Sequence, residues 1–275
     1  MKIQADVKLH NRFDLEVRDV ITGKLKQKAQ ALNIVLNQMW TRLCAGSGYF
    51  GAIQFGSGSG TLTPARTSLF SHLGARWAAD VTIIRALPTS SWRRRIVLNP
   101  EEFVGAVLSE VGIASSSGIN DLVTHAMLED SEGNPITITK TDVDVVTIFA
   151  TVFVTFSTPS GVVLIGMPNS NSLVNWLIGG GSAPAGSFSL GEAVGAGHNS
   201  LAGIGSQPSL GGSPAVTWTA DTPNRRRVSS VVRFGTTVGN GHVAEFAFSS
   251  LFRAELPLAG VFPGQPYTGV PVGTG

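Results

Sequence analysis

Glu110 and His125 are the two residues whose types and spacing could support acid–base chemistry. They lie in the stretch EVGIASSSGINDLVTHAML, where a carboxylate precedes a Ser/Gly loop and a histidine follows it. A carboxylate held next to a histidine can exchange protons with a substrate. The same pair of side chains can instead fix the corner of a sheet, so the catalytic and structural interpretations both have to be considered.

A second stretch of the chain repeats the pattern around Glu110. The first region contains AIQFGSGSGTLTPARTSL, WRRRIVL and SEVGIASSSGINDLVTHAML, and the second contains WLIGGGSAPAGSFSLGEA, NRRRVSSVVRF and AEFAFSSLFRAELPL in the same order. We interpret this as a duplicated or nested β unit. Glu245 matches Glu110, but Arg253 stands where the first copy has His125. Because a catalytic pair is seldom duplicated with its partner changed, we interpret Glu110 and Glu245 as structural carboxylates. Each would accept backbone amides at a bend or pair with an arginine.

Two arginine triplets are the most charged points of the sequence. Alternation along a strand sends the middle arginine to the face opposite its neighbours, so neither triplet forms a patch aimed at nucleic acid. Salt bridges with carboxylates within or across subunits are the favoured interpretation, those between subunits first. These candidate salt-bridge and interface arginines are Arg93, Arg94, Arg95, Arg225, Arg226 and Arg227.

Other constellations give no catalytic or cofactor site. The five histidines are far apart and lack metal-ligand spacing. The stretch FGSGSG lacks the Lys-Ser/Thr ending of a phosphate-binding loop. Asp142 and Asp144 would share one face of a strand, which leaves open a calcium site or a strand start that faces water. The sequence therefore predicts a protein that is not an enzyme and needs no cofactor.

The composition favours a chain that hides much of its surface. Charged residues make up 14 % of the 275 residues, against about 25 % in typical soluble domains, and 33 residues are glycine. Self-assembly and a well-buried monomeric β protein both explain this, and we favour self-assembly. A net charge of +2 gives no reason to expect nucleic acid or a membrane as partner. One cysteine excludes an intrachain disulfide.

Strand patterns dominate the predicted elements, so the expected fold is mainly β. We expect two β-sandwich-like units with one or two short helices and extended terminal arms. A hairpin turn is predicted at Gly23, and a helix is predicted near residues 33–44, capped by Asn33 and ended by Gly46. A second helical turn is expected at 68–73. The long threonine-rich run at 145–156 predicts either a central strand or a strand packed against another subunit.

A change in composition near residue 157 predicts a domain boundary. Every lysine lies at or before Lys140, whereas the later part is rich in glycine. We therefore expect an N-terminal β-rich domain at 1–157 and a second, Gly-rich β domain at 158–259. Residues 260–275 carry three prolines and predict an extended tail. This tail and residues 1–10 would be arms that clasp neighbouring subunits.

Residues 12–156 resemble structural proteins of tailed bacteriophages and prophages. The resemblance lies in VRDVITGKLKQKAQALNIVLNQMWTRL, IQFGSGSGTLTPARTSL and LSEVGIASSSGINDLVTHAML, followed by a closing threonine-rich strand. It implies a virion protein of the tail, baseplate or fibre, assembled in the host cytoplasm, whose partners are itself and other virion proteins. A capsid decoration protein, a head-fibre protein and a module that binds host-surface glycans remain the alternatives.

Overall fold

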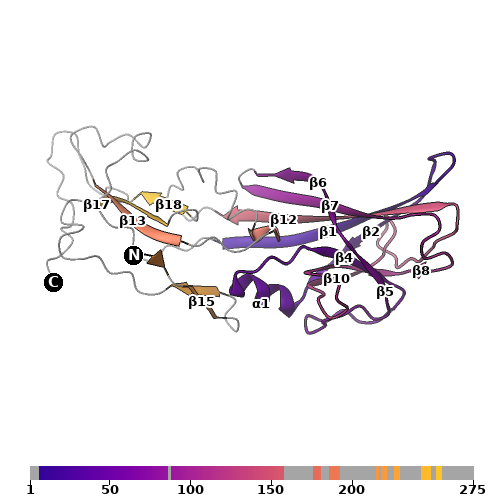
Figure 1. Cartoon of the computed structure of the whole chain (residues 1–275), viewed down its shortest axis with the longest axis horizontal. Helices are drawn as coiled ribbons and strands as arrows, with labels where there is room; N and C mark the ends of the chain where they lie inside the picture. Colours follow the sequence, from indigo (N-terminus) through magenta and orange to yellow (C-terminus); the bar gives the residue numbers. More distant parts are fainter. Residues whose placement is uncertain are drawn as a thin grey trace.

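The computed structural model describes residues 6–85, 88–157 and 176–180, together with short strand segments between residues 186 and 255. Within these residues the fold is mainly β, with several antiparallel sheets, as predicted. Figure 1 shows long strands of the first region running side by side, with the strands of the second region beyond one end. The prediction of sandwich-like units stays a prediction.

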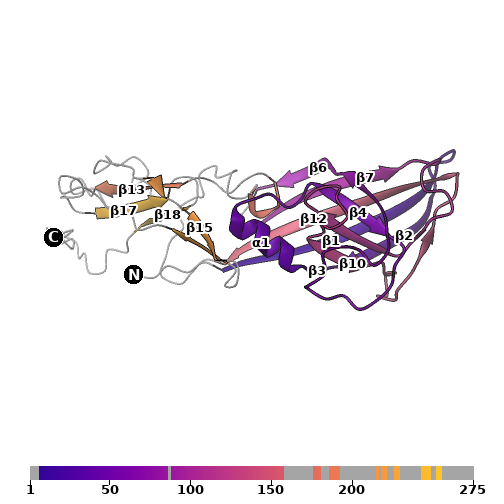
Figure 2. The same cartoon turned by 60° about the horizontal axis from the view of Figure 1, so that its bottom comes forward.

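The first sheet contains five antiparallel strands in the order β2-β1-β12-β7-β6. The predicted threonine-rich strand, β12, lies at its centre. Its neighbours are β1 and β7, and the edges are β2 and β6 (Figure 2). The strand bounds are β1 Asp6–Asp19, β2 Leu25–Leu32, β6 Ala79–Ile84, β7 Thr89–Leu98 and β12 Asp144–Ser157.

The second sheet also contains five strands, in the order β3-β10-β9-β4-β5. Glu110 is the first residue of β9, and His125 lies in the adjacent β10. A separate pair, β8 (Val107–Leu108) and β11 (Ile138–Thr139), adds a short two-stranded sheet. The bounds are β3 Ile34–Val35, β4 Ala52–Gly56, β5 His72–Trp77, β9 Glu110–Ala114 and β10 Thr124–Met127.

One hydrophobic cluster joins the two five-stranded sheets. Alternate residues of β12 point into it, because successive side chains of a strand face opposite ways. The intervening Phe149 and Phe153 are only half buried on the other face. The buried residues that β12 contributes are Val146, Ile148, Ala150, Val152 and Val154, and those from the second sheet include Ile53, Phe55, Val111, Ile113 and Ala126.

The predicted hairpin at Gly23 is confirmed. β1 and β2 are adjacent and antiparallel, and the Gly23 amide donates a hydrogen bond of 2.9 Å to the Asp19 carbonyl. Gly23 has a φ of 67°, in the left-handed region that glycine adopts without a Cβ penalty. The Asp19 carboxylate accepts the Thr22 amide at 2.9 Å, which closes the turn from inside.

The predicted helix is present but begins four residues late, and the expected second helical turn is absent. α1 spans Asn37–Ala45, because Ile34 and Val35 pair with β10 as strand β3 and Asn33 therefore caps nothing. Gly46 ends α1 in the left-handed conformation, as predicted. The expected turn at 68–73 is wrong, since residues 72–77 form strand β5.

The described strands of the second region form a four-stranded sheet, β14-β13-β17-β18, and a two-stranded sheet, β15-β16. Glu245 lies in β17, between β13 and β18. Arg226 and Arg227 begin β16. The strand bounds are β13 Gly186–Glu192, β14 Ala215–Val216, β15 Trp218–Asp221, β16 Arg226–Ser229, β17 Val243–Phe248 and β18 Phe252–Glu255.

The three strands around Glu245 are paired in the same register as those around Glu110. Glu110 lies opposite Gly56 on one side and Met127 on the other. Glu245 lies opposite Gly191 on one side and Glu255 on the other. The strand that corresponds to β4 is therefore β13. The predicted match of β4 with the stretch beginning WLIGGG is wrong, because residues 176–177 form a helical turn.

The end of β12 at Ser157 coincides with the predicted domain boundary, but the boundary is not clean. Leu177 and Ile178 are buried in the first region's core, and the Tyr49 hydroxyl donates to the Leu177 carbonyl at 2.8 Å. The predicted N-terminal arm is wrong from Asp6 onward, because β1 pairs with β12 from Asp6 opposite Ser157. The predicted tail at 260–275 lies outside the described residues.

Candidate functional site

Glu110 and His125 do meet in the fold, inside the protein. The His125 Nε2 atom lies 2.7 Å from Glu110 Oε2, and both side chains are fully buried. Neighbouring antiparallel strands bring them together, since Glu110 lies opposite Met127 and His125 precedes that residue by two. Phe70 packs against the imidazole, with ring centroids 5.0 Å apart.

Three backbone amides complete the surroundings of the Glu110 carboxylate. Oε1 accepts the amides of Gly58 and Ser71, each at 2.8 Å, and Oε2 accepts the Phe70 amide at 2.8 Å. We call Glu110, His125 and these three amides the Glu110 cluster. Each carboxylate oxygen thus has two donors, which uses the roughly four acceptor sites of the group. The carboxylate ties both ends of the loop between β4 and β5 to β9.

Two glycines give the carboxylate the space it needs. A Cβ atom at Gly56 would lie 2.4 Å from the Ser71 carbonyl oxygen and 2.6 Å from Glu110 Oε1. A Cβ atom at Gly58 would also lie 2.6 Å from Oε1. The FGSGSG stretch is therefore the loop that wraps a carboxylate of this same chain.

The cluster keeps Glu110 ionised. Burial alone would raise its pKa, but the hydrogen bonds from His125 and from the Ser71, Phe70 and Gly58 amides outweigh burial and lower the pKa below its ordinary value. At neutral pH the carboxylate is charged and its lone pairs are occupied. This arrangement stabilises a loop, and the carboxylate has no free lone pair with which to remove a proton from a substrate. The His125 Nδ1 atom has no hydrogen-bond partner, but it is buried away from the surface.

The first arginine triplet is divided between the two faces of β7. Arg94 points toward the core, donates to the carbonyls of Phe50 and Ala78, and has its Nε 3.0 Å from Asp80 Oδ1. Arg93 lies on the opposite face, over the Phe149 ring at 4.2 Å and 3.7 Å from Asp14 Oδ2. Arg95 is exposed.

These contacts weaken the expectation that the first arginine triplet forms salt bridges between subunits. Arg93 pairs with Asp14 and Arg94 with Asp80 of the same chain, so salt bridges between subunits are not needed to explain either residue. Arg225 lies outside the described residues. For Arg226, Arg227 and Glu245 only the backbone is described, and their assigned roles stay predictions.

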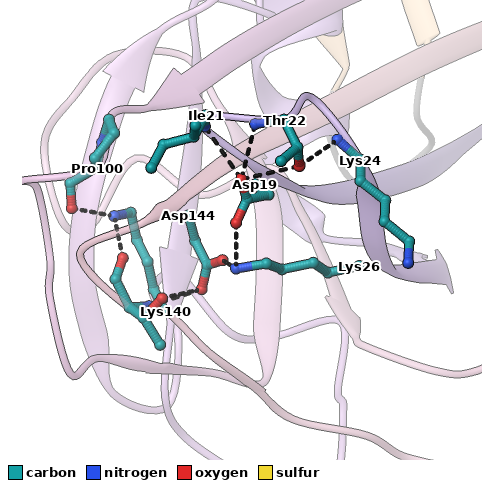
Figure 3. A network of polar contacts seen from close by, with 9 residues as sticks. Asp19, Ile21, Thr22, Lys24, Lys26, Pro100, Lys140 and Asp144 are labelled. Carbon is teal, nitrogen blue, oxygen red and sulfur yellow. Dashed lines mark hydrogen bonds and ion pairs between the residues drawn. The ribbon is translucent and has the colours of Figure 1, made fainter.

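A polar network that the sequence did not reveal lies at the β1–β2 hairpin end of the first sheet (Figure 3). The Lys26 ammonium lies 2.7 Å from Asp144 Oδ1 and 3.2 Å from Asp19 Oδ2. Thr141 donates to Asp144 through its hydroxyl at 2.6 Å and its amide at 2.9 Å. Hydrogen bonds from Thr22 and Lys26 hold the pKa of Asp19 at about 2.

Asp144 corrects the expectation that this strand start faces water. Its side chain is buried, and its hydrogen bonds with Lys26 and Thr141 outweigh burial and lower its pKa. The neighbouring Lys140 is also buried, and its ammonium donates to the Pro100 carbonyl at 2.7 Å. Among the described residues no group of three potential metal ligands occurs, so the calcium alternative gains no support.

Exposed apolar side chains are spread over the described surface, and neighbouring ones occur at the hairpin end and along β5 and β6. At the hairpin end, Ile21 is 83 % exposed next to Val20, whose amide bonds to the Val143 carbonyl. Along β5 and β6, Trp77 is 66 % exposed, and Val81 and Ile84 are also exposed.

No protein-family model, curated protein or solved structure matches this chain. The resemblance to phage structural proteins therefore rests on the quoted motifs alone. In the part of the chain that the structure describes, no helix has the length and apolar character needed to cross a bilayer.

Proposed function

We propose that this chain is a non-enzymatic structural subunit of a tailed-phage virion, a homo-oligomeric tail, baseplate or fibre-adaptor protein. The observation that carries the proposal is the Glu110 cluster. The two residues that suggested acid–base chemistry in the sequence are both fully buried, and the Glu110 carboxylate is saturated with hydrogen bonds from the chain itself. The pair holds the loop between β4 and β5 in place, which is a structural role.

The surface supports the assembly part of the proposal. Large side chains such as Trp77, Ile84 and Ile21 are at least half exposed. Trp77 and Ile84 lie on hydrogen-bonded strands, and Ile21 lies in the hydrogen-bonded turn between β1 and β2. Exposed apolar patches on an ordered surface mark sites of protein association. The low charge of the whole chain agrees with a surface that is covered in an assembly. The partners would be further copies of the chain and other virion proteins.

Negative-stain electron microscopy of the purified chain tests this function. Closed rings or fibres with a constant repeat are expected, because a subunit that gains stability on assembly forms symmetric oligomers. Dispersed particles of single-chain size at every concentration would contradict the homo-oligomeric proposal.

The exposed Trp77 favours one alternative, a module that binds host-surface glycans. An indole that is 66 % exposed offers a flat apolar face on which a sugar ring can stack. Titration of the chain with soluble host-cell polysaccharide, read by tryptophan fluorescence, separates the two functions. Saturable quenching that disappears in Trp77→Ala would support glycan binding, whereas equal responses of both proteins would argue against it.

A further inference from the structure

The two edges of the first sheet differ in how well they are protected. The outer edge strand β2 carries Lys26 and Lys28, follows Lys24, and bridges to Glu129 through Gln30. Lysines and covering segments are the devices that stop an edge strand from pairing with another chain. The opposite edge, β6, has the sequence ADVTII without any lysine, and no described strand pairs with its outer side.

The side chains of β6 are those of a strand that pairs with another strand. Thr82 and Ile84 are exposed, while Ile83 lies between them on the face that packs against Trp92 and the core. β-branched residues of this kind are favoured in strands. A bulge at Asp80–Thr82 interrupts the ladder with β7, but the stretch from Thr82 to Ile84 is regular.

We propose that β6 pairs antiparallel with β6 of a second copy of this chain, with the two-fold axis at Ile83. This inference rests on the proposed homo-oligomeric function and names the surface that would serve it. The first sheet of one copy and the first sheet of the second copy would then form one continuous sheet across the dimer. Strand addition to an exposed sheet edge is a recurrent mode of protein association.

The sequence of β6 fits this register with itself. A two-fold axis at Ile83 places Thr82 opposite Ile84 of the second copy, and both side chains lie on the exposed face. It also places Val81 opposite Arg85 of the second copy, one residue from Asp80. Asp80 has 59 % of its side chain exposed although it pairs with Arg94, so it can accept a second cation. Symmetry makes each contact twice, and Asp80 of one copy would lie diagonally across from Arg85 of the other.

Cysteine pairing tests the register. In a Cys44→Ala background, Thr82→Cys and Ile84→Cys are made as separate proteins and oxidised alone and as a mixture. The register predicts that the mixture forms at least about fivefold more disulfide dimer than either protein alone, because opposite residues have Cβ atoms only about 4.5–5.5 Å apart. Equal cross-linking of all three samples would overturn the register.

Lysine substitution tests the edge itself. The double variant Thr82→Lys and Ile84→Lys places like charges opposite each other across the two-fold axis, so its dimer dissociation constant should rise by at least about tenfold, or 1.4 kcal/mol. Gln27→Lys on β2 is the control and should leave the constant unchanged. Circular dichroism of each variant verifies that it is folded.

The outcomes separate this inference from the proposed function. If the double lysine variant keeps the oligomer of the wild type, β6 is not the interface, and the homo-oligomeric function stands on another surface. If the wild type itself is monomeric at all concentrations, the homo-oligomeric function and the β6 pairing both fail.

Discussion

The imidazole of His125 and the carboxylate of Glu110 form a fully buried pair, with 2.7 Å between Nε2 and Oε2. The carboxylate also accepts three amides from the loop between β4 and β5. A buried charge is tolerated only when it is paired and hydrogen-bonded, and here every acceptor position is filled from the chain. The pair that could have been a catalytic dyad is therefore best explained as the closure of a loop.

Glu110→Gln should lower the free energy of unfolding by at least about 1.5–3 kcal/mol, the cost of losing a hydrogen bond to a buried charged group. The substitution replaces one carboxylate oxygen with the Nε2 amino group of glutamine. This group donates hydrogen bonds and cannot accept those that the oxygen accepted. Urea unfolding followed by tryptophan fluorescence measures the change. The exposed Glu101 is the matched control, and Glu101→Gln should change the free energy by no more than about 0.5 kcal/mol.

The stability that Glu110 contributes should depend on pH in the acid range. The folded pKa of Glu110 is lowered, so its contribution is present above the ordinary value of 4.5 and is lost as the pH falls through the folded pKa. The wild type should therefore lose its advantage over Glu110→Gln as the pH falls below 4.5. Unfolding free energies of both proteins across this range test the prediction. A constant difference down to the most acid condition would contradict it.

Gly56→Ala should be destabilising, because the new Cβ atom would meet the Ser71 carbonyl at 2.4 Å as well as the carboxylate. Overpacking of this kind costs about 1–3 kcal/mol. Gly118→Ala is the control, since its new Cβ atom would meet the side chains of Asp121 and Ser116 rather than a backbone carbonyl. Thermal denaturation should show a lower midpoint for Gly56→Ala alone. Equal midpoints of the two variants would mean that the loop can move away from β9.

Arg94→Met should cost more stability than Arg95→Met, although the two residues are adjacent. The Arg94 guanidinium donates to two backbone carbonyls and pairs with Asp80, whereas Arg95 is exposed. Loss of hydrogen bonds from a charged group costs about 1.5–3 kcal/mol, and an exposed substitution costs about 0.5 kcal/mol or less. Chemical unfolding of both variants gives the comparison, and similar losses would argue against the division of the triplet between two faces.

Lys26→Met should destabilise the hairpin end by about 1–3 kcal/mol, because the buried Asp144 loses its cation. Lys28→Met, on the same strand but outside the network with Asp19 and Asp144, is the control and should be close to neutral. Differential scanning calorimetry measures both. If the two variants melt alike, the Asp19–Lys26–Asp144 network does not hold this end of the sheet.

Local patterns in the sequence predicted the features that depend on local chemistry. The Gly23 turn, the Gly46 helix end and the central position of the long threonine-rich strand follow from backbone preference and alternation, and all three are confirmed. The start of α1 was missed because pairing with β10 overrides the helical spacing at Ile34 and Val35. Tertiary contacts decide where such elements begin and end, and local patterns in a single sequence do not show which distant residues will be in contact.

In the candidate site too, local patterns were informative and contacts between distant residues could not be predicted. The structural interpretation of Glu110 came from comparison of two stretches, but its partners lie 15 to 52 residues away and depend on sheet register. The Lys26–Asp144 pair spans 118 residues and leaves no local pattern. The proposed repeat agrees with the common register around Glu110 and Glu245 but stays a prediction, and the strand that it matched to β4 is wrong.

The solution mass of the purified chain, measured by light scattering over a range of concentrations, tests the central claim most directly. A structural subunit that covers its exposed β6 edge by self-association should give a discrete multiple of 28.7 kDa that persists on dilution. Removal of residues 260–275 should loosen the oligomer if the tail acts as an arm. A constant mass of 28.7 kDa at every concentration would contradict self-assembly.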